Sequence, residues 1–223
     1  LLDVAAAREK LQRGEDDELA TLIDARIEAG ADTPTLVSLL LEKAEQRRSV
    51  GDVDGVLDAL EECLDLDPHH FGALCELVAT HRDQGEWQGA TEALILIARL
   101  KRSVDEQVWA FSQLGEVYHE HLADLPRAEA SLRRALQLAP AHTETVDRLA
   151  SVMSQQGKPA EAQAIREEIL PILRRVKGEE HSSTLTTRNN LANALLEQGK
   201  HAEARAIYEE ILPIRRRVLG DEH

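Results

Sequence analysis

The sequence predicts an all-α protein, built as an array of antiparallel helix pairs. The first observation is a repeated phrase: residues 156–171 (QGKPAEAQAIREEILP) and 198–213 (QGKHAEARAIYEEILP) are nearly identical and lie 42 positions apart. A fixed period of this size indicates one supersecondary unit that is copied and stacked. The second is composition, because Ala, Leu, Glu and Arg abound while aromatic residues make up 3% of the chain. These residues favour helices.

The chain begins with a segment in which the repeat is weak. Residues 1–13 and 16–29 read as two helices that Gly14 separates. Asp16 and Asp17 are placed to favour the amino terminus of the second helix. We therefore predict that residues 1–32 form a degenerate repeat or an amino-terminal capping hairpin.

Residues 33–158 are predicted to form units of about 34 residues, each a helix, a short turn and a second helix. A glycine suited to the left-handed turn recurs at Gly51, Gly85, Gly157 and Gly199. Small residues mark the place where the two helices should touch: Ala90, Ala128, Ala162 and Ala204. The second helices then offer apolar or small residues at two further contact positions: Leu60, Leu94 and Leu132 at one, and Cys63, Ile97, Ala135 and Ile169 at the next.

Residues 159–223 repeat with the longer period of 42 residues. A first helix is expected over 184–198, Gly199 ends it, and a second helix starts near Ala202. Pro171 and Pro213 fall inside the predicted second helices, where a proline removes a hydrogen bond and clashes with the preceding turn. We expect a kink or a helix break at both, and we expect the array to continue beyond His223.

This pattern resembles the tetratricopeptide repeat, a helix–turn–helix unit of 34 residues with the signature W-x2-L-G-x2-Y, A-x3-F and P. The best match starts Phe111-x2-Leu114-Gly115-x2-Tyr118 and continues with Ala128-x3-Leu132 and Pro140. It lacks the turn glycine and has one extra residue between Tyr118 and Ala128, which predicts a longer turn. The last two units resemble the kinesin-light-chain type of the repeat. The resemblance implies a right-handed superhelical solenoid over residues 33–223.

Charge and composition limit the classes of ligand. The net charge is −15; residues 1–100 hold 22 acidic and 9 basic residues, whereas residues 101–223 hold 19 and 17. An acidic chain repels phosphate backbones, so we expect no nucleic acid partner. The acidity indicates either an acidic binding surface for a basic partner or a solvated outer face. No apolar run reaches the roughly 18 residues of a membrane span, so no membrane insertion is expected.

The remaining motifs predict neither catalysis nor a cofactor. The chain has no Gly-rich phosphate loop, no Gly-x-Ser-x-Gly elbow and no Cys-x2-Cys pair. Its two cysteines, Cys63 and Cys75, read as reduced helix residues, which fits a cytoplasmic protein. Arginine outnumbers lysine by 20 to 6, which is typical of a GC-rich bacterial genome. We expect a non-enzymatic protein with no metal site.

The family resemblance also implies where a ligand would bind, because the first helices of such repeats line a concave groove. By register, the groove residues with partner-binding potential are Leu41, Glu45, Arg48, Arg82, Trp109, Glu116, Glu144, Asp147, Asn189 and Asn193. Since many of them are acidic or neutral, a clamp for a terminal carboxylate is disfavoured and a basic or amphipathic segment is favoured. Asn189 and Asn193 either bond a peptide backbone or are simply solvated. Trp109 either anchors a partner or packs against the neighbouring unit.

These expectations favour a scaffold that binds a protein or peptide partner in the groove. Two alternatives remain open. The chain is either a regulatory or sensor segment of a larger signalling enzyme, such as a kinase or NTPase, or a module that self-associates through an uncapped carboxy-terminal hairpin.

Overall fold

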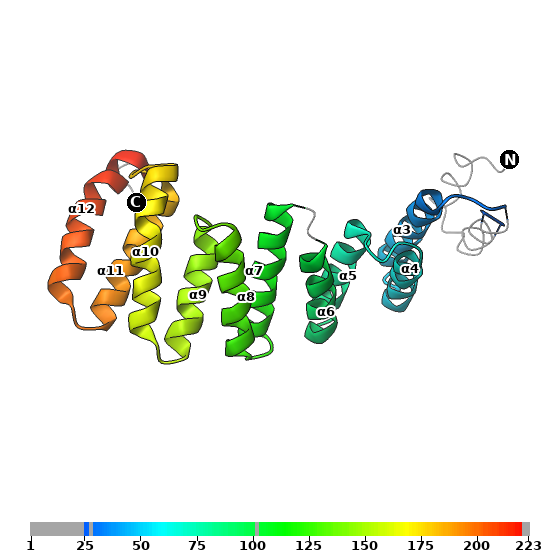
Figure 1. Ribbon diagram of the computed structural model, residues 1–223, viewed down its shortest axis with the longest axis horizontal. Helices are drawn as coiled ribbons and strands as arrows, with labels where there is room; N and C mark the ends of the chain where they lie inside the picture. The colour runs from blue at the N-terminus through cyan, green and yellow to red at the C-terminus, as the bar shows by residue number, and fades with distance from the viewer. Residues whose placement is uncertain (1–24, 27–28, 101–102, 220–223) are drawn as a thin grey trace. The chain divides into compact units, whose positions relative to one another are not determined.

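In a computed structural model of the chain, the residues that can be described are 25–26, 29–100 and 103–219. They form helical hairpins, each with a first and a second helix (Figure 1). The first helices are α3 (Thr33–Ser49), α5 (Phe71–Asp83), α7 (Val104–Glu120), α9 (Thr143–Gln155) and α11 (Ser182–Glu197). The second helices are α4 (Val53–Leu66), α6 (Trp87–Arg99), α8 (Leu125–Leu138), α10 (Pro159–Lys177) and α12 (His201–Leu219).

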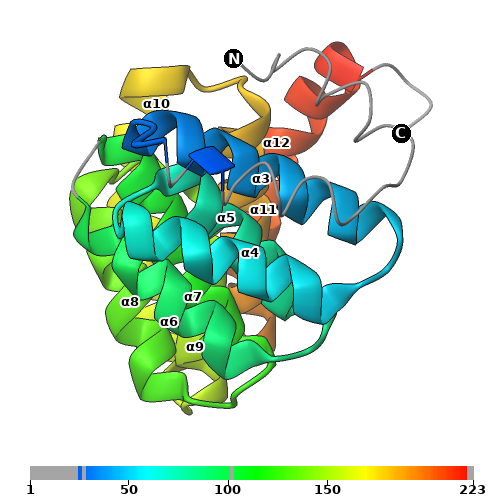
Figure 2. The same cartoon turned by 90° about the vertical axis from the view of Figure 1, so that its right-hand side faces the viewer.

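The predicted all-α array of helix pairs is thus confirmed. The helices predicted within residues 1–32 lie outside the described residues, apart from residues 25–26 and 29–32, and so do residues 220–223. The chain divides into two compact units, residues 1–100 and 101–223. In the first, α3 packs on α4, α4 on α5, and α5 on α6; Figure 2 shows α3 beside α4. In the second, each helix from α7 to α12 packs on the next.

The turns explain why the hairpins close where they do. Gly51, Gly85, Gly157 and Gly199 all take positive φ, from 72° to 77°. In each turn the residue after the glycine donates its N–H to the carbonyl five residues back, as Glu86 does to His81 at 2.8 Å. This is the 6→1 bond of a Schellman motif, which satisfies a carbonyl at the helix end. The predicted turn glycines are confirmed.

The hairpin of α7 and α8 has the longer turn that the sequence predicts. Four residues, 121–124, separate its helices, whereas three separate α9 from α10. Ala123 takes the left-handed conformation there, with φ 51°. The Asp124 N–H donates to the carbonyl of Tyr118 at 2.8 Å. An alanine therefore performs the role that glycine has in the other described turns.

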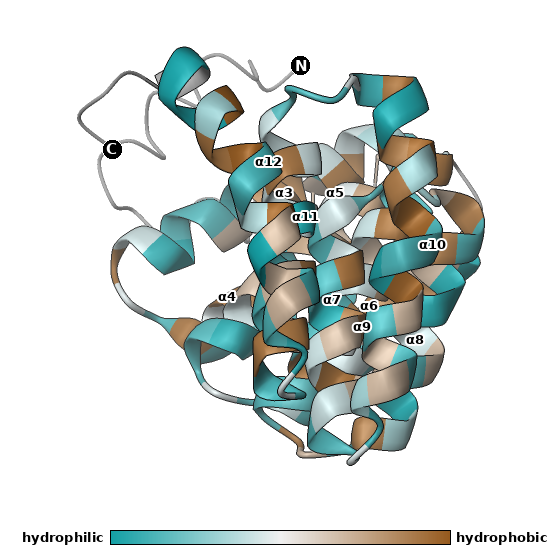
Figure 3. Cartoon of the chain, turned by 90° about the vertical axis from the view of Figure 1, so that its left-hand side faces the viewer, coloured by the Kyte–Doolittle hydropathy of each residue, from teal (hydrophilic) through white to brown (hydrophobic). Residues whose placement is uncertain are grey.

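The core of each unit is built from small and medium apolar residues. Every residue predicted at the three helix contact positions is buried, from Leu60, Cys63 and Ala90 to Ile169 and Ala204. In the first unit a cluster joins α3 and α4 around Leu40, Ala59 and Leu60. In the second, Val146, Ile169 and Leu173 form one cluster, and Leu191, Leu195 and Ala204 form another. Polar and apolar residues alternate around α10 and α12, as Figure 3 shows.

One expectation about the second helices is corrected. The predicted break at Pro171 and Pro213 is wrong, because α10 and α12 each continue as one helix through the proline. Both prolines are exposed, so their rings face solvent and displace no neighbouring helix. The loss of one N–H and the crowding of the preceding turn are tolerated inside a helix of 19 residues. The predicted bend at these sites stays a prediction.

Candidate functional site

The first helices of the second unit form one continuous row. Helix α9 contacts both α7 and α11. Side chains cap the amino ends of these helices: Ser103 accepts from the Glu106 N–H at 3.1 Å, and His181 Nδ1 accepts from the Ser183 N–H at 3.1 Å. Such caps satisfy N–H groups that the helix leaves unpaired. The row therefore begins in a defined register and brings several of the predicted groove residues together.

Glu116 and Glu144 share one arginine. Arg148 of α9 pairs with Glu116 of α7, and its Nη2 lies 2.8 Å from Glu144 Oε1. The Glu116 side chain is only 12% exposed, whereas that of Glu144 is 64% exposed. Arg148 thus links two repeats and leaves the Glu144 carboxylate largely in water. Of Glu116 and Glu144, therefore, only Glu144 is accessible to a partner.

Asp147 links α9 to both of its neighbours. Its Oδ1 accepts a hydrogen bond from Asn190 Nδ2 of α11 at 2.8 Å and lies 3.9 Å from Arg166 Nε of α10. Burial lowers the pKa of the Arg166 guanidinium, and the charges of Asp147 and Glu197 act in the opposite direction. Asp147 therefore has a structural role between repeats in addition to its predicted place in the groove.

The two asparagines and the tryptophan differ in their surroundings. Asn193 is exposed and its side-chain oxygen accepts a hydrogen bond from the Tyr208 hydroxyl. Asn189, one turn earlier on α11, is half-buried. Trp109 of α7 is 39% exposed, which leaves a large aromatic surface in contact with water. Exposed aromatic groups of this kind often anchor a binding partner.

In the first unit the predicted residues are α3 and α5 side chains. Leu41 packs against the buried cluster of α3 and α4, so little of it can face a ligand. Arg48 pairs with Glu76 of α5 and donates to the Thr80 hydroxyl at 3.1 Å. Glu45 is exposed, and Arg82 is half-buried. Glu45 is thus the open acidic position of this set.

The row of α7, α9 and α11 has an excess of negative charge. Glu116, Glu144 and Asp147 pair with the guanidinium groups of Arg148 and Arg166, and Glu197 of α11 also acts on Arg166, so carboxylates outnumber cations in this set. Among the described residues, no cluster of three His, Cys, Asp or Glu side chains is suited to hold a metal ion. No helix in the described part of the chain combines the length and apolarity needed to cross a bilayer.

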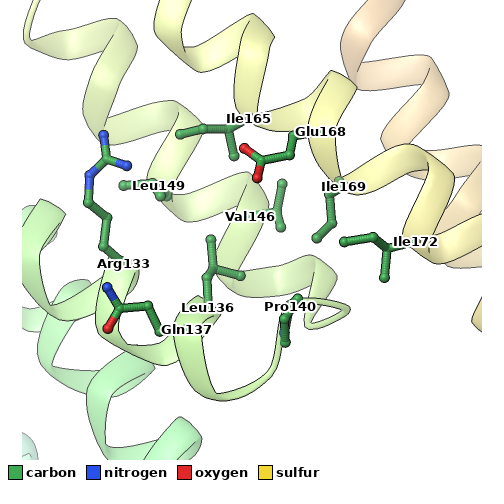
Figure 4. Close-up of a pocket in the computed structure, with 10 residues that line it drawn as sticks. All are labelled: Arg133, Leu136, Gln137, Pro140, Val146, Leu149, Ile165, Glu168, Ile169 and Ile172. Carbon is green, nitrogen blue, oxygen red and sulfur yellow. The ribbon is translucent and has the colours of Figure 1, made fainter.

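A pocket of about 370 Å³, which the sequence did not predict, lies between α8, α9 and α10 (Figure 4). Its walls are mainly apolar, with Arg133, Gln137 and Glu168 at its polar positions. One signal in the sequence points to it. In the repeat register Val146 stands where the preceding repeat has Phe111 and the following one Arg188, so a small side chain replaces two large ones.

Comparisons with known proteins agree with this architecture. Residues 142–222 match the family model described as "Tetratricopeptide repeat". No curated protein matches the chain by sequence. Three solved structures are similar to this chain in fold. A MamA protein has a TM-score of 0.61 at 21% identity, over 84% of this chain and 96% of that chain.

The second is the Podosopora anserina putative kinesin light chain with nearly identical TPR-like repeats, with a TM-score of 0.58 at 20% identity, over 82% of this chain and 97% of that one. The third is YrrB, described as a TPR protein with an unusual peptide-binding site, with a TM-score of 0.56 at 17% identity, over 88% and 93%. At such identities these likenesses concern the fold. Residues 142–222 therefore match the tetratricopeptide repeat by sequence, and the helical hairpins as a whole are similar to tetratricopeptide-like arrays in fold.

Proposed function

We propose that the chain is a protein-interaction scaffold that binds a basic or amphipathic segment of a protein partner along α7, α9 and α11. The observation that carries this proposal is the open, acidic character of the row. Glu144 is 64% exposed and shares its only described cation, Arg148, with Glu116. A cationic side chain of a partner would complete the charge balance.

Exposed groups on both sides of Glu144 extend the proposed surface. Trp109 offers an aromatic face on α7, and Asn193 offers an amide on α11. An aromatic anchor beside charged and amide groups suits a short segment that has both apolar and basic side chains. YrrB, whose fold is similar, is a tetratricopeptide repeat protein with a peptide-binding site, which supports a peptide ligand.

The test measures peptide binding by fluorescence anisotropy. One labelled peptide alternates arginine with leucine, and its charge-reversed counterpart alternates glutamate with leucine. We expect the basic peptide to bind, with an affinity that falls as salt is raised, because partly exposed charges are screened. Glu144→Lys should weaken this binding by about tenfold, the equivalent of about 1.4 kcal/mol.

Glu92→Lys is the matched control. Glu92 is exposed on α6, a second helix of the first unit and not part of the row, and the substitution makes the same change in net charge. Equal weakening by the two variants would show that only net charge matters, and equal binding of the acidic peptide would refute the proposal. Asn189→Ala with Asn193→Ala tests the amides separately: unchanged binding would remove both from the site.

A further inference from the structure

The pocket between α8, α9 and α10 has a mainly apolar interior with one acidic group directed into it. Its apolar walls include Leu136 of α8, Val146 and Leu149 of α9, and Ile165 and Ile172 of α10. In Figure 4 the Glu168 carboxylate points into the pocket near Val146, whereas Arg133 lies on the opposite side. A volume of about 370 Å³ lies within the range of ligand pockets, roughly 300–1,000 Å³.

The two charged side chains of the pocket are not equivalent. Arg133 is already paired: its Nε lies 2.8 Å from Glu129 Oε1, and its Nη2 lies 3.9 Å from Glu161 Oε2. Glu168 makes no hydrogen bond or ion pair with any residue in the described part of the chain. The pocket therefore has an unmatched negative charge next to apolar walls.

The following repeat contains a close copy of the walls that α9 and α10 provide. With the offset of 42 residues, Leu149, Ile165 and Ile169 become Leu191, Ile207 and Ile211. Glu168 becomes Glu210 in the same way. The small Val146, however, becomes Arg188. The walls from α8 are not repeated in this way: in the register that aligns Ala128 with Ala162, Arg133 becomes Glu167 and Gln137 becomes Pro171.

Arg188 shows what these walls accommodate. It belongs to α11, and its side chain is 5% exposed. The guanidinium pairs with Glu210, the counterpart of Glu168, and its Nη1 lies 3.9 Å from Glu179. A buried guanidinium is stable only where carboxylates compensate it, and the arginine stem packs well on apolar surfaces.

We infer that the pocket of α8, α9 and α10 receives an arginine side chain from a protein partner. The stem of that arginine would contact the leucine and isoleucine walls, and its guanidinium would pair with Glu168. Val146, which lines the pocket and is buried, has a shorter side chain than Arg188, its counterpart one repeat later. None of the residues that line this pocket is among the predicted groove residues, so the inference does not depend on the proposed groove.

Other side chains match the pocket less well. A leucine would satisfy the walls but would partly remove Glu168 from water without giving it a partner, which is unfavourable. A lysine places a compact, strongly hydrated charge at a single point, whereas the planar guanidinium can meet a carboxylate with two parallel hydrogen bonds. The chemistry therefore favours arginine.

The test follows the methyl resonances of Ile165 and Ile172 by NMR in the full chain. The probe is Nα-acetyl-arginine methylamide; the comparison probes are the citrulline analogue, which keeps the shape and loses the charge, and the leucine analogue. We expect saturable shifts with the arginine probe and binding at least about tenfold weaker with the other two, because the leucine probe has no side-chain donor for Glu168 and the citrulline probe has lost the positive charge.

Variants locate the interaction. Glu168→Gln should weaken binding of the arginine probe by about tenfold. Glu167→Gln is the matched control, since Glu167 is the adjacent exposed residue and bonds Gln163 at 2.6 Å. Val146→Arg should abolish binding by filling the pocket, and Arg188→Val should create a second site beside Glu210.

Several outcomes would overturn the inference. These are equal binding of the leucine or citrulline probe, equal effects of Glu168→Gln and Glu167→Gln, or no saturable shift at Ile165 and Ile172. Shifts of the same methyl groups when the protein alone is concentrated would show that a second copy of the chain is the occupant. Glu144→Lys should leave probe binding unchanged, so failure here and failure of the proposed groove are distinguishable.

Discussion

Ala123 occupies the position at which the other described hairpin turns have a glycine. Its φ of 51° lies in the left-handed region, where a Cβ atom approaches the following carbonyl oxygen. The Asp124 N–H bond to Tyr118 and the Asp124 cap on the Arg127 N–H, at 2.8 and 3.0 Å, keep the turn in this conformation. The turn therefore contains local strain that a single substitution can relieve.

Ala123→Gly should stabilise the second unit by about 0.5–1 kcal/mol, because the left-handed cost of about 1–2 kcal/mol exceeds the entropy that glycine adds to the unfolded chain. The measurement is the midpoint of denaturant unfolding. Gly157→Ala is the converse control. A Cβ at that position would meet no atom within 4 Å, so any loss of stability comes from the backbone alone. A lower midpoint for Ala123→Gly would contradict the prediction.

Glu129 introduces a pH-dependent contribution to stability. A hydrogen bond from Arg133, supported by bonds from Gln156 and Lys158, lowers the pKa of this carboxyl although burial raises it. A carboxyl whose folded pKa is lowered stabilises the protein above its unfolded pKa, and that contribution is lost as the pH falls through the folded pKa.

Glu129→Gln should therefore lower the free energy of unfolding near pH 7 by about 0.5–1 kcal/mol, the value of a partly exposed ion pair. The difference from the parent protein should shrink as the pH falls below about 4.3, the ordinary pKa of glutamate. Unfolding midpoints across this range provide the check. Glu167→Gln, the same change at an exposed position of α10 in the same unit, should have a smaller effect near pH 7. A difference for Glu129→Gln that stays constant with pH would contradict the assignment.

At the scale of the helix, α10 tolerates an exposed proline in its interior. Pro171 cannot donate to the carbonyl of Glu167, and its ring crowds the preceding turn. The helix nevertheless continues to Lys177, packs on both α9 and α11, and buries Ile169 and Leu173. Tertiary packing thus outweighs the local preference of the chain.

Pro171→Ala should raise the stability of the second unit by about 1–3 kcal/mol, because alanine restores the hydrogen bond and is favoured over proline inside a helix by about 3 kcal/mol. The unfolding midpoint and amide exchange along α10 measure the effect. Pro159→Ala is the control: Pro159 is the first residue of the same helix, where proline is well suited, so no gain is expected. Destabilisation by Pro171→Ala would mean that a bend at this site is required for packing.

At the scale of the whole molecule, the two units have separate buried clusters. The cluster of the first unit extends from Val37 to Ala73, and those of the second lie between Val146 and Ala204. In repeat proteins most stabilising contacts join neighbouring repeats, so a run of adjacent hairpins retains most of its stability without distant ones.

A fragment of residues 101–223 should accordingly fold without residues 1–100. We expect helical circular dichroism, cooperative unfolding and methyl resonances for Leu149, Ile165 and Leu191 that match those of the full chain. The control is the fragment of residues 101–158. It lacks α10, which contributes Ile169 and Leu173 to one cluster. Loss of dispersed resonances in 101–223 would contradict the prediction.

Much of this architecture follows from the order of the residues alone. A strict period predicts turn glycines and small contact residues, and these were confirmed at Gly157 and Ala162 because they depend only on local backbone geometry and on one neighbouring helix. The four-residue turn before α8 followed from a single inserted residue. The assignment of Trp109, Glu144 and Asn193 to a partner-binding surface remains a prediction.

Other features depend on contacts between repeats, which a period cannot specify. The continuity of α10 through Pro171 reflects packing on two neighbours, and the partial burial of Glu116 reflects its shared arginine on the next first helix. Val146, which lines the pocket, is smaller than its counterparts Phe111 and Arg188, and the effect of such a difference depends on whether the surrounding walls move inward. Repetition therefore determines the hairpins, whereas the match of side-chain size and charge between folded neighbours determines which surfaces remain open to a ligand.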